Sequence, residues 1–133
     1  MGDKKRNTFQ FNWSATANIP YSPNVPRSGV TTGAMASTNT IYSNVVDISN
    51  TDNQGLEITW TGTPTGTISV MCSESGVNFY ALTFDPAITQ PAGSAGGYLI
   101  DLNQVPWRYV MIQYTNASGT GSLFSYIGSK DLN

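Results

Sequence analysis

The sequence predicts an all-β protein, a jelly-roll-like antiparallel β-sandwich preceded by an extended N-terminal arm. Charged residues make up only 11% of the 133 residues, against about 25% in ordinary soluble domains. Ser, Thr, Asn and Gly are abundant instead, and these residues weaken helix interiors. Short runs rich in β-branched and aromatic residues recur between turn signals, which predicts a sandwich of about seven or eight strands.

The arm is expected over residues 1–39 and the sandwich over residues 40–133, because the composition changes between them. Pro20, Pro23 and Pro26 fix the backbone angle φ and remove hydrogen-bond donors, so this part cannot be a helix or a central strand. Gly, Ser and Thr follow up to residue 40. This composition indicates an extended segment followed by a flexible one.

Three aromatic residues alternate upstream of the prolines, in the run FQFNW. Phe9, Phe11 and Trp13 share one side of an extended segment. Apolar surface left in water costs about 25 cal/mol per Å². We therefore expect these rings to dock, either on the protein's own domain or on another subunit.

Strand patterns follow one another at short intervals after residue 40. The first run, TIYSNVVDIS, loses its alternation near Asn44, which indicates a β-bulge. LEITWT and TISVMCS alternate regularly across the turn GTPTG, and NFYALTF and YLIDL follow on either side of a Pro- and Gly-rich connection. The last two runs, WRYVMIQYT and SLFSYIG, are expected to pair as a hairpin across NASGTG. The side chains expected to face the core are Leu56, Ile58, Trp60, Ile68, Val70, Cys72, Tyr80, Leu82 and Phe84.

The residue inventory excludes most catalytic designs. The sequence has no histidine, which removes the usual general base near neutral pH, and one cysteine, Cys72, which leaves no disulfide or structural zinc site. We expect Cys72 to be a buried, unreactive thiol. A carboxylate pair for glycoside hydrolysis remains as a third alternative, although no spacing singles out two partners. The acidic candidates are Asp47, Asp52, Glu57, Glu74, Asp85 and Asp101.

The three tryptophans have different expected roles. Trp60 is in phase with Leu56 and Ile58, which favours the core. Trp107 opens a strand and fits the rim or the core equally well. Trp13 is the best candidate for contact with another molecule. Because exposed aromatic rings also bind sugars and jelly rolls are common lectin scaffolds, carbohydrate binding is a second hypothesis.

The charge distribution gives no strong indication of a nucleic-acid partner. The formal net charge is −2, so no specific nucleic acid is expected. Lys4, Lys5 and Arg6 form a short basic stretch, for which a solubilising role is one reading. No apolar run follows them as in a secretory signal, and none approaches the roughly 20 residues that span a bilayer. We therefore expect synthesis in the cytoplasm and no membrane partner.

Residues 60–130 contain four features that recur in small structural proteins of tailed bacteriophages. These are a TGTPTGT turn leading into a strand, a DLNQ…WR segment, a YTNASGTG turn and a terminal SLFSYIGSK strand. This half of the chain resembles virion β-sandwich proteins of the capsid decoration or cement type. The resemblance implies a non-enzymatic protein on the capsid surface of a virion, and it brings no catalytic residues with it.

The resemblance and the arm together predict a structural protein that binds and stabilises the assembled capsid shell. The implied partners are the major capsid protein and neighbouring copies of the same chain, in a homo-oligomer on the shell, with no cofactor and no metal. The alternative is a carbohydrate- or receptor-binding module on a phage fibre or surface. The partner-binding residues expected in the arm are Lys4, Lys5, Arg6, Phe9, Phe11, Trp13, Pro20, Tyr21, Pro23 and Pro26.

Overall fold

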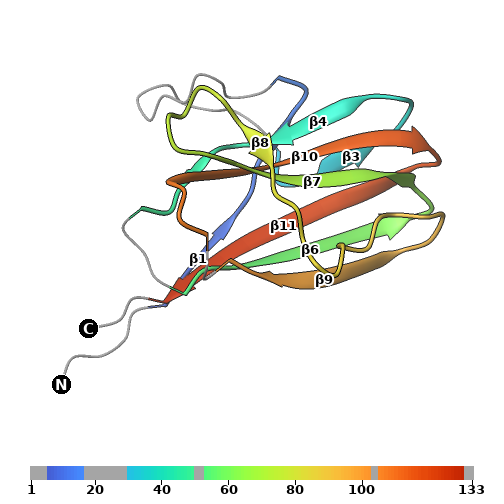
Figure 1. Ribbon diagram of the computed structural model, residues 1–133. Coiled ribbons are helices and arrows are strands. Elements are labelled where there is room, and N and C mark those ends of the chain that lie inside the picture. The colour runs from blue at the N-terminus through green and yellow to red at the C-terminus, as the bar shows by residue number, and fades with distance from the viewer. Residues whose placement is uncertain (1–5, 17–29, 50–52, 103–104, 131–133) are drawn as a thin grey trace.

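A computed structural model describes residues 6–16, 30–49, 53–102 and 105–130 of the chain. In these residues the protein is all-β, with eleven strands and no helix. The strands form two antiparallel sheets that pack face to face (Figure 1). The prediction of an all-β sandwich is confirmed.

We refer to the first sheet as sheet A. It has the strand order β1-β11-β6-β9, and β3 also pairs with β11. Its strands are β1 (Arg6–Gln10), β3 (Gly33–Met35), β6 (Gly55–Gly62), β9 (Gly96–Asp101) and β11 (Gly121–Lys130).

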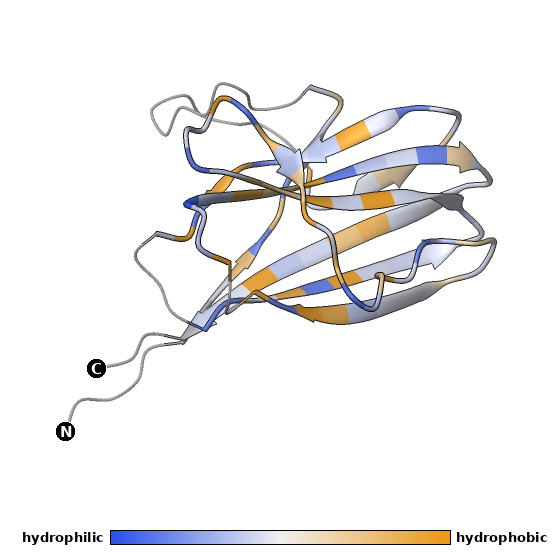
Figure 2. Ribbon diagram, in the orientation of Figure 1, coloured by the Kyte–Doolittle hydropathy of each residue, from blue (hydrophilic) through white to orange (hydrophobic). Residues whose placement is uncertain are grey.

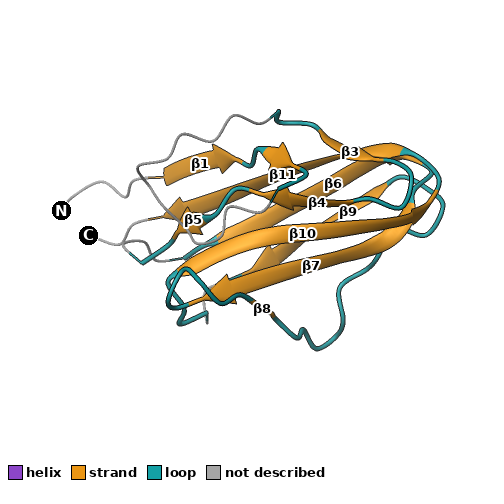
Figure 3. Cartoon of the chain, turned by 90° about the horizontal axis from the view of Figure 1, so that it is seen from above, coloured by secondary structure: helices purple, strands orange, loops and turns teal. Residues whose placement is uncertain are grey.

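We refer to the second sheet as sheet B. It has the strand order β2-β4-β10-β7-β8, and β5 also pairs with β10. Seen from above, β8 and the loop after it lie along one side of the sandwich (Figure 3). The strands of sheet B are β2 (Trp13–Ser14), β4 (Thr40–Ser43), β5 (Val46–Asp47), β7 (Thr65–Ser73), β8 (Tyr80–Ala81) and β10 (Tyr109–Ser118).

The connectivity is that of a jelly roll. Leaving aside the short strands β2, β3 and β5, the pairs are β1 with β11, β4 with β10, β6 with β9 and β7 with β8. In chain order, the first strand therefore pairs with the last, the second with the seventh, and so on inward. This nested pairing wraps one long hairpin into two sheets, as in viral capsid and lectin domains.

Apolar side chains fill the space between the sheets and alternate with polar ones along the strands (Figure 2). In β6 and β7, Leu56, Ile58, Trp60, Ile68 and Val70 are all buried, as the period-two pattern predicts. The core also contains Phe11, Trp13, Met35, Ile41, Cys72, Ile100, Leu102, Val110, Ile112, Tyr114, Leu123 and Ile127.

The predicted hairpin between the last two strand patterns is wrong. The strands β10 and β11 follow each other directly, but β10 pairs with β7 and β4 in sheet B, and β11 pairs with β6 and β1 in sheet A. The NASGTG turn therefore carries the chain across the sandwich. It lies against the β6–β7 turn, where Thr63 N donates to Thr120 O at 2.9 Å. Gly62 and Gly119 have positive φ, and a Cβ at Gly119 would clash with the Thr63 carbonyl.

The expectation of an extended arm over residues 1–39 is wrong for the described part of that segment. The strand β1 pairs with β11 from Arg6 opposite Lys130 to Gln10 opposite Tyr126. The strands β2 and β3 also belong to the two sheets, so the sandwich does not begin at residue 40. The physical reason is the nested pairing, which needs a first strand to cover the free edge of the last one.

The glycine that follows the proline-rich part has a packing role. At Gly33 in β3, an added Cβ would come within 3.0 Å of the Trp13 ring and 2.9 Å of Ile41 Cδ1. Only a residue without a side chain leaves room for the buried indole there. Glycine in this segment therefore indicates close packing rather than flexibility.

Two local expectations are refined. The irregularity near Asn44 is present as a break between β4 and β5, both of which pair with β10. Asn44 bridges this break to the N-terminal segment, because its Oδ1 accepts from Asn12 N at 2.8 Å. In the run NFYALTF, Leu82 and Phe84 pack against the core, but Tyr80 does not. The expectation that Tyr80 faces inward is wrong.

Candidate functional site

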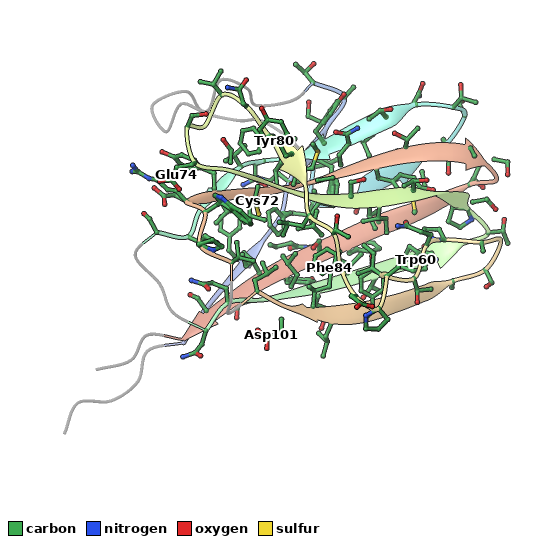
Figure 4. The ribbon with its side chains drawn as sticks, viewed as in Figure 1. Trp60, Cys72, Glu74, Tyr80, Phe84 and Asp101 are labelled. Carbon is green, nitrogen blue, oxygen red and sulfur yellow. The ribbon has the colours of Figure 1, made fainter. Side chains whose placement is uncertain are left out.

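One hollow on the described surface lies at the end of β7 in sheet B, beside β8. We call it the Trp107 hollow; its volume is about 460 Å³. Figure 4 shows Glu74 and Tyr80 at this end of the molecule, around Cys72, with Asp101 on the opposite sheet. The side chains that line it include those of Cys72, Glu74, Asn78, Tyr80, Leu82 and Trp107.

A turn held by serine hydroxyls shapes one wall of the Trp107 hollow. Ser73 Oγ accepts from Gly76 N at 2.9 Å, and Ser75 Oγ accepts from Val77 N at 3.1 Å and from Asn78 N at 3.2 Å. These local bonds order the turn without a regular ladder. The turn is therefore built in advance of any ligand, which lowers the entropy cost of binding.

Two aromatic side chains stand open to solvent at this hollow. Tyr80 is 71% exposed and Trp107 is 43% exposed. The carboxylate of Glu74 and the amide of Asn78 lie on exposed residues nearby. Apolar rings next to a few polar groups suit a ligand with both apolar faces and hydroxyl groups, such as a sugar, or an aromatic-rich protein surface.

Cys72 lines the Trp107 hollow but is not equipped to act as a nucleophile. Its side chain is buried, as predicted, and burial raises the pKa of the thiol to about 11. The thiol is therefore protonated near neutral pH, and only the thiolate reacts readily. Cys72 contributes shape to the hollow rather than chemistry.

A second hollow lies on the outer face of sheet A. We call it the Glu57 hollow; its volume is about 530 Å³. Its floor is low because Gly55 in β6 lies opposite Gly128 in β11, so two paired positions carry no side chain. Tyr126 and Glu57 are paired in the next row of the same face, and Asp101 lies opposite Gly55. The sheet register thus brings two carboxylates to one shallow surface.

The Glu57 hollow brings two of the acidic candidates, Glu57 and Asp101, to one cavity wall. Glu57 and Asp101 are both exposed on an open sheet face. Water therefore screens their charges, whereas catalysis by carboxylate pairs relies on groups held apart from bulk water around a bound sugar. The arrangement can hold polar groups of a partner more readily than it can catalyse hydrolysis.

Asp47 is committed to a structural contact. It accepts from Ser49 N at 2.9 Å and from Ser49 Oγ at 2.6 Å, and lies 3.3 Å from Arg108 Nε. Partial burial raises the pKa of Asp47, but the Ser49 hydrogen bonds and the Arg108 guanidinium outweigh that effect and hold the pKa below its ordinary value. The pair links β5 to the residue after Trp107. Among the other acidic candidates, Asp85 is exposed in the loop after β8, and Asp52 lies outside the described residues.

The structure separates the residues that were expected to bind a partner. Phe11 and Trp13 are 0% and 3% exposed and belong to the protein's own core. Phe9 packs edge-on against Phe11 but remains 45% exposed. Arg6 lies in β1. The remaining expected arm residues, Lys4, Lys5, Pro20, Tyr21, Pro23 and Pro26, lie outside the described residues.

Two exposed residues of the surface were missed by the sequence reasoning. Tyr80 was placed inside by its period-two spacing, and nothing local reveals that β8 is only two residues long. Leu99 in β9 is 79% exposed. A signal for Leu99 existed, because residues two apart on a strand share a face, and Asp101 marks the outer face.

Comparisons with known proteins leave the family open. No protein-family model matches the chain, and no curated protein matches it. Among solved structures, the chain is similar to the crystal structure of the SPBc2 prophage-derived protein YomS, with 11% sequence identity and a TM-score of 0.46, over 98% of this chain and 97% of that one. At this level the similarity assigns neither a family nor a function.

Two further searches of the described residues were negative. No group of three or more His, Cys, Asp or Glu side chains is placed to hold a metal ion in these ranges. None of the described segments forms a helix long and apolar enough to cross a membrane.

Proposed function

We propose that the protein is a structural protein of a bacteriophage virion, which binds and stabilises the assembled capsid shell without catalysing a reaction. The observation that carries this proposal is the nested jelly-roll pairing, an architecture used by viral capsid and lectin domains. The resemblance of residues 60–130 to decoration proteins supports the same function. The proposed partner is the major capsid protein, with further copies of this chain beside it on the capsid surface.

The proposed mode of attachment differs from an arm that wraps a neighbour. Since Phe11 and Trp13 lie in the core, contact with the shell falls to side chains on the surface of the sandwich. Tyr80 and Trp107 at the Trp107 hollow are the aromatic pair best placed for this, because rigid, exposed aromatic rings carry much of the energy of protein interfaces. Repetition over many equivalent shell sites would add avidity.

The test is co-sedimentation with undecorated capsids, together with the melting temperature of the shells. Deletion of residues 1–39 is unsuitable, because it removes β1, β2 and β3. The test variant is instead the double substitution of Tyr80→Ala and Trp107→Ala, with Val30→Ala, at a residue 65% exposed, as the matched control. We expect the wild type and the control to bind and to raise shell melting, and the double variant to bind at least about tenfold more weakly. If the wild-type protein stays in the supernatant while the intact shells sediment, the proposal is contradicted.

A second candidate function is glycan binding at the Trp107 hollow, on a phage fibre or surface. The specific observation in its favour is that Glu74 and Asn78 lie beside two exposed rings. A lectin would bind glycans as an isolated domain, and Trp107→Ala would abolish the binding. A glycan array followed by titration of the isolated protein separates this function from shell binding, which needs assembled capsids.

A further inference from the structure

The two sheets differ in how their edge strands are covered. The edges concerned are β7 with β8 in sheet B and β9 in sheet A. In sheet B, β8 covers only the end of β7, where it pairs with Met71 and Cys72. The loop after β8 continues the cover, because Leu82 N donates to Val70 O at 2.8 Å. The Gln90 side chain then takes the place of a strand, since its amide accepts from Ile68 N and donates to Ile68 O. The free hydrogen-bonding edge of β7 is thus largely covered within the chain.

In the part of the chain that the structure describes, no second strand covers the edge of sheet A at β9. Within the described residues, β6 is the only strand that pairs with β9. All three outward-facing residues, Gly97, Leu99 and Asp101, are exposed, and Leu99 is 79% exposed. Strand edges left open in this way usually carry lysine, proline or a bulge that blocks pairing. The run GGYLI has none of these and no charge before Asp101.

We propose that β9 pairs antiparallel with β9 of a second copy of this chain, about a two-fold axis at Leu99. Such a pair makes one continuous sheet across the two copies, in the order β1-β11-β6-β9 followed by its reverse. Strand addition at an open edge supplies main-chain hydrogen bonds, and two-fold pairing is the commonest way for identical chains to associate.

The register follows from the side chains. Residues directly opposite each other in an antiparallel pair share a face. An axis at Leu99 places the two exposed leucines against each other and Asp101 opposite Gly97 of the other copy. An axis at Asp101 would oppose two carboxylates, and an axis at Tyr98 would set each leucine against a glycine. Only the Leu99 axis both removes the most exposed apolar side chain from water and keeps like charges apart.

The occupant is a second copy because the strand is complementary to itself in this register. Its five paired positions, Gly97 to Asp101, need no charge or bulky group from a different partner. The proposal is independent of shell binding, because it concerns the isolated protein in solution. A negative result for dimerisation therefore does not contradict shell binding, and a negative result for shell binding does not contradict dimerisation.

The first test is sedimentation equilibrium of the isolated protein over a range of concentrations. We expect the wild type to form a dimer, and Leu99→Lys to weaken dimerisation by at least about tenfold, because it places two like charges against each other. The matched control is Val77→Lys, at a residue 50% exposed on the other side of the sandwich. It should dimerise like the wild type, and circular dichroism should confirm that both variants are folded. A monomeric wild type at all concentrations, or equal weakening by both variants, overturns the proposal.

The second test is disulfide cross-linking, which reports the register. Leu99→Cys should give a covalent dimer under mild oxidation, because the two Cα atoms lie about 4.5–5.5 Å apart in an antiparallel pair. Val77→Cys should not, and the buried native Cys72 is not available to form the link. A covalent dimer from Val77→Cys but not from Leu99→Cys contradicts the assignment to β9. A wild-type dimer without the Leu99→Cys link overturns the Leu99 axis.

Discussion

The N-terminal segment and the segment from β8 through β9 both carry large apolar side chains, but these side chains are buried in the first and exposed in the second. Phe11 and Trp13 are buried between the sheets, at 0% and 3% exposure, whereas Tyr80 and Leu99 are 71% and 79% exposed. The nested pairing explains the difference. Because β1 covers the edge of β11 and β2 pairs with β4, Phe11 and Trp13, which follow β1 in the chain, lie between the two sheets. The chain from β8 through β9 runs along the outer edges of the sheets, where some side chains have only one sheet to contact.

The sharpest test of this contrast compares two tryptophans. Trp13→Ala should lower the free energy of unfolding by about 3–5 kcal/mol, because it removes a buried ring and leaves a cavity. Trp107→Ala should change it by less than about 1 kcal/mol, since that ring is 43% exposed. Urea denaturation followed by circular dichroism gives both values. Equal losses of unfolding free energy would mean that Trp13 contributes no more to the stability of the fold than Trp107 does.

A second test concerns a buried amide in β10, Asn116, which bonds to the segment that follows β3. Asn116 accepts from Tyr114 Oη at 2.7 Å and donates to Ser37 O at 2.8 Å and to Gly119 O at 3.1 Å. Asn116→Ala should cost about 2–3 kcal/mol, because it leaves the fully buried Tyr114 hydroxyl without its partner. Denaturant unfolding measures the loss, and Asn78→Ala, at an exposed amide, is the control. A loss no larger than in the control would show that the network adds nothing.

A third test concerns the side-chain amide of Gln90, which bonds to the main chain of Ile68 at the edge of β7. Gln90→Ala should cost about 1–2 kcal/mol, because two main-chain groups of Ile68 lose their partner at a partly buried site. It should also increase aggregation at high concentration, since the edge of β7 is then open. Thermal unfolding and light scattering check the two effects, with Thr89→Ala as the neighbouring control. Unchanged scattering would mean that Gln90 does not protect this edge.

The smallest effect is expected at the ion pair of Asp47 and Arg108. Asp47→Asn should cost about 0.5 kcal/mol at neutral pH, because both partners are partly exposed. The folded-state pKa of Asp47 lies below its ordinary value of 3.8, so its contribution is complete above that value and is lost as pH falls through the folded-state pKa. Unfolding curves of the two proteins should therefore differ at pH 6 and converge as the pH falls below the lowered folded-state pKa of Asp47. A constant difference across this range would contradict the assignment.

The alternation of side chains was accessible from local pattern alone. Ile58 and Trp60, or Ile68 and Val70, point inward because successive side chains of a strand face opposite ways, whatever the strand pairs with. The burial of Cys72 follows from the same phase. These predictions required no knowledge of neighbours, so the all-β class and most of the core on β6 and β7 follow from the sequence.

The sequence left the partners of the aromatic N-terminal run open. The pattern of Phe9, Phe11 and Trp13 shows that the rings need an apolar surface, but not whose surface it is. The answer depends on β11, more than 100 residues away, whose edge β1 covers. The candidate site has the same origin, because Tyr80 and Trp107 come together only when β8 and the start of β10 meet at one end of sheet B.

By itself, then, the sequence determined the all-β class, the inner faces of β6 and β7 and the absence of histidine chemistry. The tertiary structure decided which sheet each strand joins, as with β10 and β11, which separate at a turn that equally suits a hairpin. It also decided which edge is covered, at Gln90, and which stays open, at Leu99. The physical reason is that strand periodicity is local, whereas strand pairing depends on residues far apart in the chain.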